Sequence, residues 1–211
     1  MSRYKTIAAT VDVEMEIQRS RFLTRLARVE TEEAAREIIA AVQAEHPRAR
    51  HHCTAFVLGP DGRIQRSNDD GEPSGTAGTP MLEALNAAEL SDVVAVVTRY
   101  FGGILLGAGG LTRAYRASVA QAVEAAQPVT RELQQQVTVT CAYEVSGGLV
   151  NAALRQGFVL GEAVYGAEVA QDFWVPVGAE EQLRVLAAEQ SAGSAVCETG
   201  GQAFVDLADA H

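Results

Sequence analysis

A buried strand, a glycine-rich loop and an amphipathic helix follow one another between residues 93 and 127, and this order constrains the fold more than any other feature. Residues 93–97 read Val-Val-Ala-Val-Val, a β-branched run that is too short for an isolated helix and typical of a strand buried on both faces. The next stretch, 99–113, holds five glycines, and apolar residues then recur at helical spacing. The order predicts a domain of mixed α and β structure.

The glycine-rich loop is a candidate anion site. Glycines permit positive φ and a close backbone approach, and the following helix start offers unpaired N–H donors and the positive end of its dipole. Arg99 and Arg113 flank the stretch. Its spacing matches neither G-x-G-x-x-G nor G-x-x-x-x-G-K-[ST], so a tight connection that binds nothing is the alternative.

Composition indicates a globular chain with two electrostatically different parts. The 211 residues are 47% hydrophobic and 21% charged, which is enough to bury the core of one large or two small domains. Residues 1–126 carry 14 Lys and Arg against 16 Asp and Glu, whereas residues 127–211 carry 3 against 11. We expect the second part to repel a phosphate backbone, while the first can present a local basic face.

The cysteines and the apolar pattern indicate a cytoplasmic protein. Cys53, Cys141 and Cys197 are far apart, odd in number and without a C-x-x-C partner, which argues against a disulfide framework and a zinc site. No apolar run reaches the length of about 18 residues that a membrane span needs. We expect no cofactor and no membrane partner.

Periodicity predicts the elements of the first half. Apolar residues alternate over 7–17, which predicts one continuous half-exposed strand, and residues 21–29 are expected to return antiparallel to it. Thr31 is a suitable N-cap for the helix that follows. Strands are then expected over 53–58 and 63–66, on either side of a Gly-Pro-Asp-Gly turn.

A second loop of about a dozen residues, 67–78, has no apolar periodicity, and loops of that length inside a domain are often functional. Asp69, Asp70 and Glu72 are hard oxygen ligands of the kind that Mg²⁺ prefers, although such a run is also common in solvated turns. Thr79, followed by proline, is the expected N-cap of the next helix. We expect this loop and the glycine-rich loop to form two walls of one pocket.

The pattern starts afresh beyond Pro128. Strand-like alternation, a short helix, two strands around Gly166, another helix and a last strand give the order β-α-β-β-α-β of a ferredoxin-like unit. We place a linker at residues 127–131 and predict domains at 1–127 and 132–211.

The candidate binding residues come from the two loops, a histidine pair and the flanking arginines. Adjacent His51 and His52 point to opposite faces of one strand, so at most one of them faces a given side as a general acid or base. No nucleophile is identifiable, and no catalytic residue or metal ligand is assigned. The candidates are Asp69, Asp70, Gly71, Glu72, Thr76, Gly78, Thr79, Arg99, Tyr100, Gly102, Gly103, Gly107, Gly109, Gly110, Arg113, His51 and His52.

Further arginines and one more aromatic residue are available around these loops. Arginine is suited to bidentate contact with phosphate or carboxylate, and flat side chains offer a surface on which a base can stack. Surface arginines are mostly solvated, however, and aromatic residues after a core strand are more often packing. These residues are Arg48, Arg50, Arg63, Arg66, Arg116 and Phe101.

Four segments, in order, resemble the IMPACT/YigZ family; they are residues 20–22, 49–53, 69–82 and 99–107. The resemblance covers about residues 20–126, and the acidic remainder resembles a small domain that bacterial members append. It implies an α+β chain of two domains. The first is similar to ribosomal protein S5 domain 2, a β-sheet with helices on one face, and the second is ferredoxin-like and similar to the C-terminal domains of elongation factor G.

The resemblance also implies a link to translation. Eukaryotic IMPACT proteins compete for the activator of a starvation-responsive kinase that targets an initiation factor; their N-terminal partner-binding domain is not expected here, because the match begins almost at Met1. We expect a cytoplasmic, non-enzymatic regulator that binds RNA or a ribosomal component, without DNA sequence readout. The alternatives are a Mg²⁺-dependent enzyme acting on a phosphorylated small molecule or nucleotide, and a protein-interaction module.

Overall fold

The computed structural model describes residues 2–207, which divide into two compact units between Thr130 and Arg131. The described chain contains five helices and two sheets, so the predicted α+β class is confirmed. No helix among these residues is long and apolar enough to cross a membrane.

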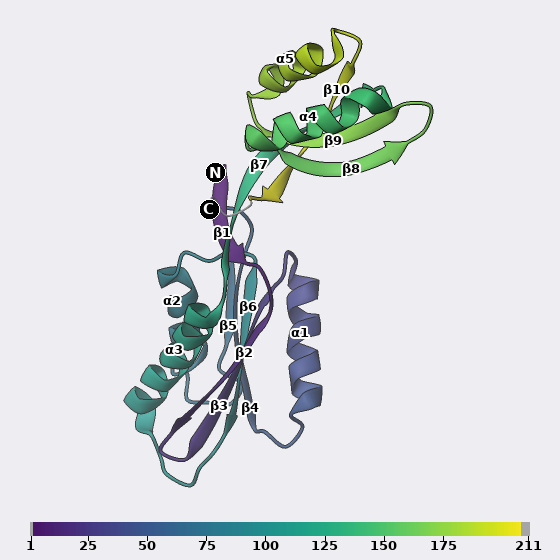
Figure 1. The fold of residues 1–211 in the computed structure, drawn as a ribbon. Helices are drawn as coiled ribbons and strands as arrows, with labels where there is room; N and C mark the ends of the chain where they lie inside the picture. Colours follow the sequence, from purple (N-terminus) through teal and green to yellow (C-terminus); the bar gives the residue numbers. More distant parts are fainter. Residues whose placement is uncertain (1, 208–211) are drawn as a thin grey trace. The chain divides into compact units, whose positions relative to one another are not determined.

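Five antiparallel strands form the sheet of the first unit, in the order β2-β3-β6-β4-β5 (Figure 1). They are β2 (Val11–Ile17), β3 (Ser20–Arg28), β4 (His51–Leu58), β5 (Ile64–Asn68) and β6 (Val93–Tyr100). The predicted buried strand is the central β6, in which every residue except Tyr100 is buried. Its β-branched run therefore marks the middle of the sheet.

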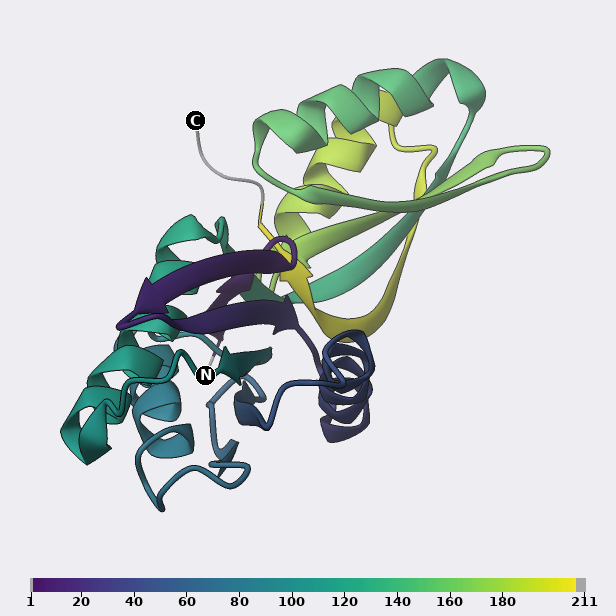
Figure 2. The ribbon, with the colours of Figure 1, turned by 90° about the horizontal axis from the view of Figure 1, so that it is seen from below.

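Helices cover both faces of this sheet (Figures 1 and 2). Val94 and Val96 pack on the face covered by α1 (Glu32–Glu45), whereas Val93 and Val97 pack on the face covered by α2 (Gly78–Ala87) and α3 (Gly107–Ala125). The expectation that all helices lie on one face is wrong. Because both faces of β6 are apolar, each face needs its own cover.

The single strand expected over residues 7–17 is two strands. β1 (Arg3–Ile7) ends before Ala8, whose N–H donates to the Gln127 carbonyl at 2.9 Å, and β2 starts at Val11. β1 pairs with β7 rather than extending β2. Alternation predicts an extended backbone but not the strand to which it hydrogen-bonds, so it could not reveal the break.

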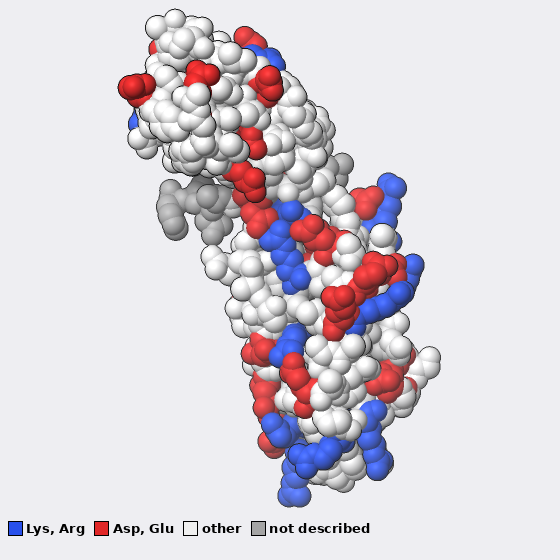
Figure 3. All heavy atoms as spheres, turned by 90° about the vertical axis from the view of Figure 1, so that its right-hand side faces the viewer, with Lys and Arg blue, Asp and Glu red and all other residues white. Residues whose placement is uncertain are grey.

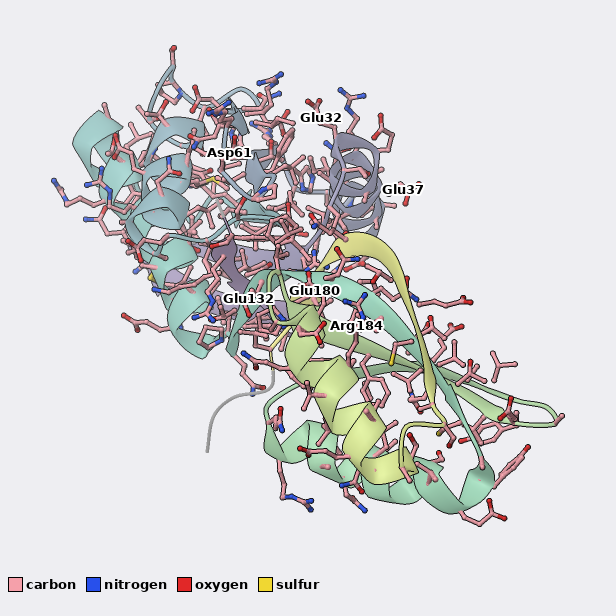
Figure 4. All side chains as sticks on the ribbon, turned by 90° about the horizontal axis from the view of Figure 1, so that it is seen from above. Glu32, Glu37, Asp61, Glu132, Glu180 and Arg184 are labelled. Atoms are coloured by element: carbon pink, nitrogen blue, oxygen red, sulfur yellow. The ribbon has the colours of Figure 1, made fainter. Side chains whose placement is uncertain are left out.

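Two local predictions in the first unit are confirmed. Thr31 Oγ1 accepts a hydrogen bond from the Ala34 N–H at 3.1 Å and so caps α1. The Gly-Pro-Asp-Gly turn closes through the Gly62 N–H, which donates to the Gly59 carbonyl at 3.0 Å. On the outer surface of α1, the Glu37 side chain is exposed and points into solvent (Figure 4).

The second unit has the expected order β-α-β-β-α-β. Its elements are β7 (Pro128–Cys141), α4 (Tyr143–Arg155), β8 (Val159–Tyr165), β9 (Val169–Pro176), α5 (Glu180–Ser191) and β10 (Val196–Asp206). The strands lie antiparallel in the order β10-β7-β9-β8, over a core that includes Leu149, Phe173 and Leu183. The stretch expected as a linker, 127–131, mostly forms the start of β7.

Candidate functional site

A pocket of about 500 Å³ lies at one end of the first unit's sheet, where β4 begins and β6 ends. These strand ends meet because β4 and β6 are antiparallel neighbours, with His51 opposite Arg99. The volume is in the range of small-molecule sites. The lining residues are Arg48, Ala49, Arg50, His51, Arg99, Tyr100, Phe101 and Leu105.

The lining of this pocket carries positive charge. Arg48 and Arg50 are exposed, and neither forms an ion pair within residues 2–207. No Asp or Glu of the described chain lines the pocket. Figure 3 shows Lys and Arg side chains gathered at the lower end of the first unit, the end at which Figure 1 places the start of β4 and the loop after β6. A cleft lined by one sign of charge attracts the opposite sign, which here is an anion.

Arg99 is the buried member of this group, with 6% of its surface exposed. Its Nη1 donates to Glu72 Oε1 at 2.8 Å and its Nη2 to Ser20 Oγ at 3.4 Å. The guanidinium carbon lies 5.6 Å from the centre of the Phe22 ring and 5.7 Å from that of Phe101. The Nε atom is buried and has no hydrogen-bond partner among the described residues. Arg99 is therefore fixed in place and keeps one donor unused.

Glu72 holds Arg99 from the core side. The same Oε1 atom also accepts a hydrogen bond from the Tyr115 hydroxyl at 2.7 Å. Burial is the main cause that raises the pKa of Tyr115, and burial also raises the pKa of the neighbouring Cys53 to about 12. Burial therefore favours the neutral thiol of Cys53 at physiological pH.

Asp69 caps α2 with its carboxylate. Oδ1 accepts from the backbone N–H groups of Ala77 at 3.0 Å and Gly78 at 2.8 Å, and Oδ2 accepts from Gly75 at 2.7 Å. Burial opposes ionisation, but these three hydrogen bonds outweigh it and lower the pKa of Asp69. The prediction that Thr79 caps this helix is wrong, because α2 begins at Gly78 and Thr79 lies exposed in its first turn.

Asp70 is tied to the histidine pair through the backbone. Its Oδ2 accepts from the His52 N–H at 2.6 Å, and its carbonyl lies 2.9 Å from His51 Nδ1. A carbonyl only accepts, so Nδ1 of His51 carries the hydrogen and Nε2 is left available beside the pocket. His52 is buried against Thr98, and burial is the main cause that lowers its pKa.

The three loop carboxylates do not converge on one point. Asp69 caps a helix, Asp70 binds a strand and Glu72 pairs with Arg99. Across the described part of the chain, no group of three or more His, Cys, Asp or Glu side chains is placed to hold a metal ion. The magnesium alternative stays a prediction that draws no support from this geometry.

Comparisons with known proteins cover the first unit and, for some relatives, nearly the whole chain. A family model described as the Impact N-terminal domain matches residues 18–123. The Bacillus subtilis protein named IMPACT family member YvyE is 38% identical over 208 residues, covering 99% of this chain and 96% of that protein. The chain belongs to the IMPACT family.

Two further relatives cover most of this IMPACT-family chain. The Escherichia coli protein named IMPACT family member YigZ is 41% identical over 177 residues, which are 78% of this chain and 87% of that protein. A solved structure titled "Crystal structure of an hypothetical protein" is 39% identical, with a TM-score of 0.65, and the match covers 93% of this chain and 97% of that one. The resemblance seen in the sequence is thus confirmed.

Three of the seventeen candidate residues line the pocket: His51, Arg99 and Tyr100. Glu72 contacts Arg99 from the core side, and the rest of the 69–79 loop does not reach the lining. The loop over residues 67–78 was expected to form the second wall of the pocket, but residues 48–50, which precede β4, line it instead. The candidates that do not line the pocket are His52, Asp69, Asp70, Gly71, Glu72, Thr76, Gly78, Thr79, Gly102, Gly103, Gly107, Gly109, Gly110 and Arg113.

Gly102 allows two backbone segments to pack closely. A Cβ atom at this position would lie 2.0 Å from the backbone carbon of Arg19, in the turn between β2 and β3. Its N–H donates to Ser20 Oγ at 3.2 Å. The glycine lets the loop after β6 pack directly against that turn, so a side chain does not fit there.

Five lining residues are not among the seventeen candidates: Arg48, Ala49, Arg50, Phe101 and Leu105. Arg48, Arg50 and Phe101 carry the right chemistry in the sequence, but their proximity depends on the pairing of β4 with β6. Leu105 is 86% exposed. Its signal is an apolar side chain inside a glycine-rich loop, where a solvated residue is expected.

Proposed function

We propose that this IMPACT-family protein binds RNA through the arginine-lined pocket of its first unit and acts as a non-enzymatic regulator linked to translation. The observation that carries the proposal is the pair of exposed arginines, Arg48 and Arg50, in one pocket with the buried Arg99, and with no acidic side chain of residues 2–207 in its lining. Phosphate contacts from arginine and lysine supply most of the non-specific affinity for nucleic acid. A cytoplasmic location is part of the same proposal, because translation occurs there.

The charge distribution supports binding by the first unit rather than by the whole chain. Residues 1–126 are close to balanced, whereas residues 127–211 carry 3 Lys and Arg against 11 Asp and Glu. The second part therefore repels a phosphate backbone, and the basic pocket must work against it. We expect modest affinity that falls steeply as salt rises.

The proposal also assigns each unit to a known fold. The antiparallel order β10-β7-β9-β8 of the second unit favours a ferredoxin-like domain similar to those at the C-terminus of elongation factor G. The first unit is proposed to be of the ribosomal protein S5 domain 2 type, with α1 as a cover on the second face of its sheet. Likeness of fold to proteins of the ribosome cycle supports a role in translation by analogy alone.

The test compares two double variants by fluorescence anisotropy with a short single-stranded RNA at low and physiological salt. Arg48→Ala with Arg50→Ala removes two pocket charges and is expected to weaken binding about tenfold or more at low salt. The slope of log affinity against log salt concentration is negative, and its magnitude should decrease by about 1.4. This decrease corresponds to the loss of two phosphate contacts with a single strand.

The matched control removes the same charge from the β5 side of the sheet. Arg63 and Arg66 are exposed and pair with Asp61 and Glu32, both labelled in Figure 4. Arg63→Ala with Arg66→Ala should leave RNA affinity within about twofold of the wild type, since only general charge changes. Equal losses in both double variants, or no RNA binding by the wild type at low salt, would refute the proposed site.

A further inference from the structure

The pocket combines two kinds of surface that one nucleotide would use together. Arg48 and Arg50 supply positive charge, Arg99 supplies a buried guanidinium that is paired with Glu72, and Phe101 and Leu105 supply apolar surface. An inorganic anion would contact the arginines but not the apolar side chains. An apolar ligand would contact the apolar side chains but leave the arginines without a partner. A phosphate joined to a flat aromatic base matches both.

We infer that the pocket takes one unpaired nucleotide of an RNA strand, with its phosphate against the arginines and its base against Phe101 and Leu105. The inference rests on the proposed RNA binding and adds that the pocket selects single strands over duplex. The volume of about 500 Å³ accommodates a ligand of nucleotide size.

Arg99 offers the phosphate a donor that the fold leaves unused. Its Nε atom is buried without a hydrogen-bond partner in the described chain, although the guanidinium is held by Glu72 and Ser20. Buried donors without partners are rare in folded proteins. A phosphate oxygen or a bridging water that enters the pocket and displaces the atoms covering Nε would supply the missing partner.

Phe101 offers the base a supported aromatic ring. The guanidinium carbon of Arg99 lies 5.7 Å from the centre of the ring, and 56% of the residue is exposed. A ring that is held on one side by a cation and open elsewhere is suited to stacking with a base. Leu105, 86% exposed on the same loop, adds apolar contact beside it.

A duplex cannot make these contacts without opening. In A-form RNA the bases are stacked inside the helix, so only phosphates and sugars would reach the arginines. Bringing one base to Phe101 would require unpairing and unstacking it, which costs free energy. An unpaired nucleotide in a loop or at a strand end carries no such cost.

The experiment compares a single-stranded RNA with a hairpin duplex of the same composition, both labelled at the same end, by fluorescence anisotropy. We expect the single strand to bind about tenfold more tightly, as one stacked base allows. Phe101→Ala should remove this preference by lowering the affinity for the single strand toward that for the duplex. Tyr165→Ala removes an exposed aromatic ring, 70% exposed in the second unit, and should leave the preference intact.

Calorimetry with AMP and with adenosine separates the two halves of the pocket. AMP is expected to bind weakly and adenosine not at all, and Arg50→Ala should abolish the AMP signal. Adenosine binding as tightly as AMP would overturn the assignment of the phosphate to the arginines.

Failure of this inference is distinguishable from failure of the proposed function. Equal affinity for single strand and duplex, with Phe101→Ala without effect, overturns the unpaired-nucleotide pocket and leaves RNA binding standing. A wild-type protein that binds neither RNA at low salt overturns both.

Discussion

Two glycine-rich loops lead into α2 and α3. The loop before α2 is closed by its own carboxylates, whereas the loop before α3 leaves apolar side chains exposed. In the loop before α2, Asp69 accepts three backbone hydrogen bonds and Glu72 is buried against Arg99. In the loop before α3, Phe101 and Leu105 are 56% and 86% exposed, and the apolar side chain of Leu106 at the N-cap cannot accept a hydrogen bond. Composition is similar, but only the first loop contains carboxylates with which to close itself.

The difference teaches which of two similar loops is available to a ligand. Acidic side chains in a glycine-rich loop can satisfy the loop's own N–H groups and the first turn of the next helix, and they then belong to the fold. A loop without them leaves its apolar tip and its helix start to solvent. Substitutions should therefore cost stability in the first loop and binding in the second.

The largest effect on stability is expected for Glu72→Ala. It leaves the buried guanidinium of Arg99 without a counter-charge and the Tyr115 hydroxyl without its acceptor, so the free energy of unfolding should fall by about 3–5 kcal/mol. Urea denaturation measures the loss. Adding Arg99→Met, which removes the unpaired charge, should restore part of it.

Two outcomes would contradict this account of Glu72. A loss below about 1 kcal/mol, the range of a surface ion pair, would mean that the Arg99–Glu72 pair contributes little. A loss matched by Glu37→Ala, which removes an exposed carboxylate of α1, would mean that only net charge matters.

A smaller effect is expected for Asp69→Ala, which deprives three backbone N–H groups of their acceptor and should cost about 1–3 kcal/mol near pH 7. The folded-state pKa of Asp69 is lowered, so the stabilisation is present above the unfolded pKa of about 3.9 and is lost as pH falls through the folded value. The difference between wild type and variant should therefore narrow below about pH 4.

Urea titrations of both proteins at several pH values test this dependence. A difference that stays constant from neutral to strongly acidic pH would show that the charge of Asp69 plays no part in capping α2. Glu37→Ala again serves as the control, because its carboxylate is exposed on the helix surface.

The smallest effect on stability is expected for Leu105→Ala, since a side chain that is 86% exposed buries little area to lose. The change should stay within about 0.5 kcal/mol, while affinity for single-stranded RNA falls. Thermal denaturation and anisotropy measure the two quantities on one preparation. A variant that unfolds more easily than Asp69→Ala, or that binds RNA as the wild type does, would remove the contrast between the loops.

Local chemistry could be predicted from the sequence, whereas partners distant along the chain could not. The buried β6, the Thr31 cap and the order of elements in the second unit all follow from periodicity or from residues within one turn. The break between β1 and β2, and the cover of both sheet faces, depend on which segments pair and pack. Periodicity carries no information on that choice.

The candidate site shows the same limit. Asp69, Asp70 and Glu72 have the chemistry of metal ligands, but their hydrogen bonds run to Gly78, His52 and Arg99. The lining of the pocket depends on the register between β4 and β6. This register places His51 opposite Arg99, and Arg48 and Arg50 therefore lie beside the end of β6. Residue types predicted an anion site near Arg99, and the pocket proposed for it includes Arg99, but residues 48–50 on its other side were identified only from the tertiary structure.

The burial of two thiols makes the site accessible to spectroscopy. Cys53 and Cys141 are buried, and burial raises the pKa of both, so they react slowly with thiol reagents. With Cys197→Ser in the half-buried third position, a Leu105→Cys variant would take a single fluorophore at the mouth of the pocket. Its emission would report occupancy directly, in solution and at equilibrium, without a label on the RNA.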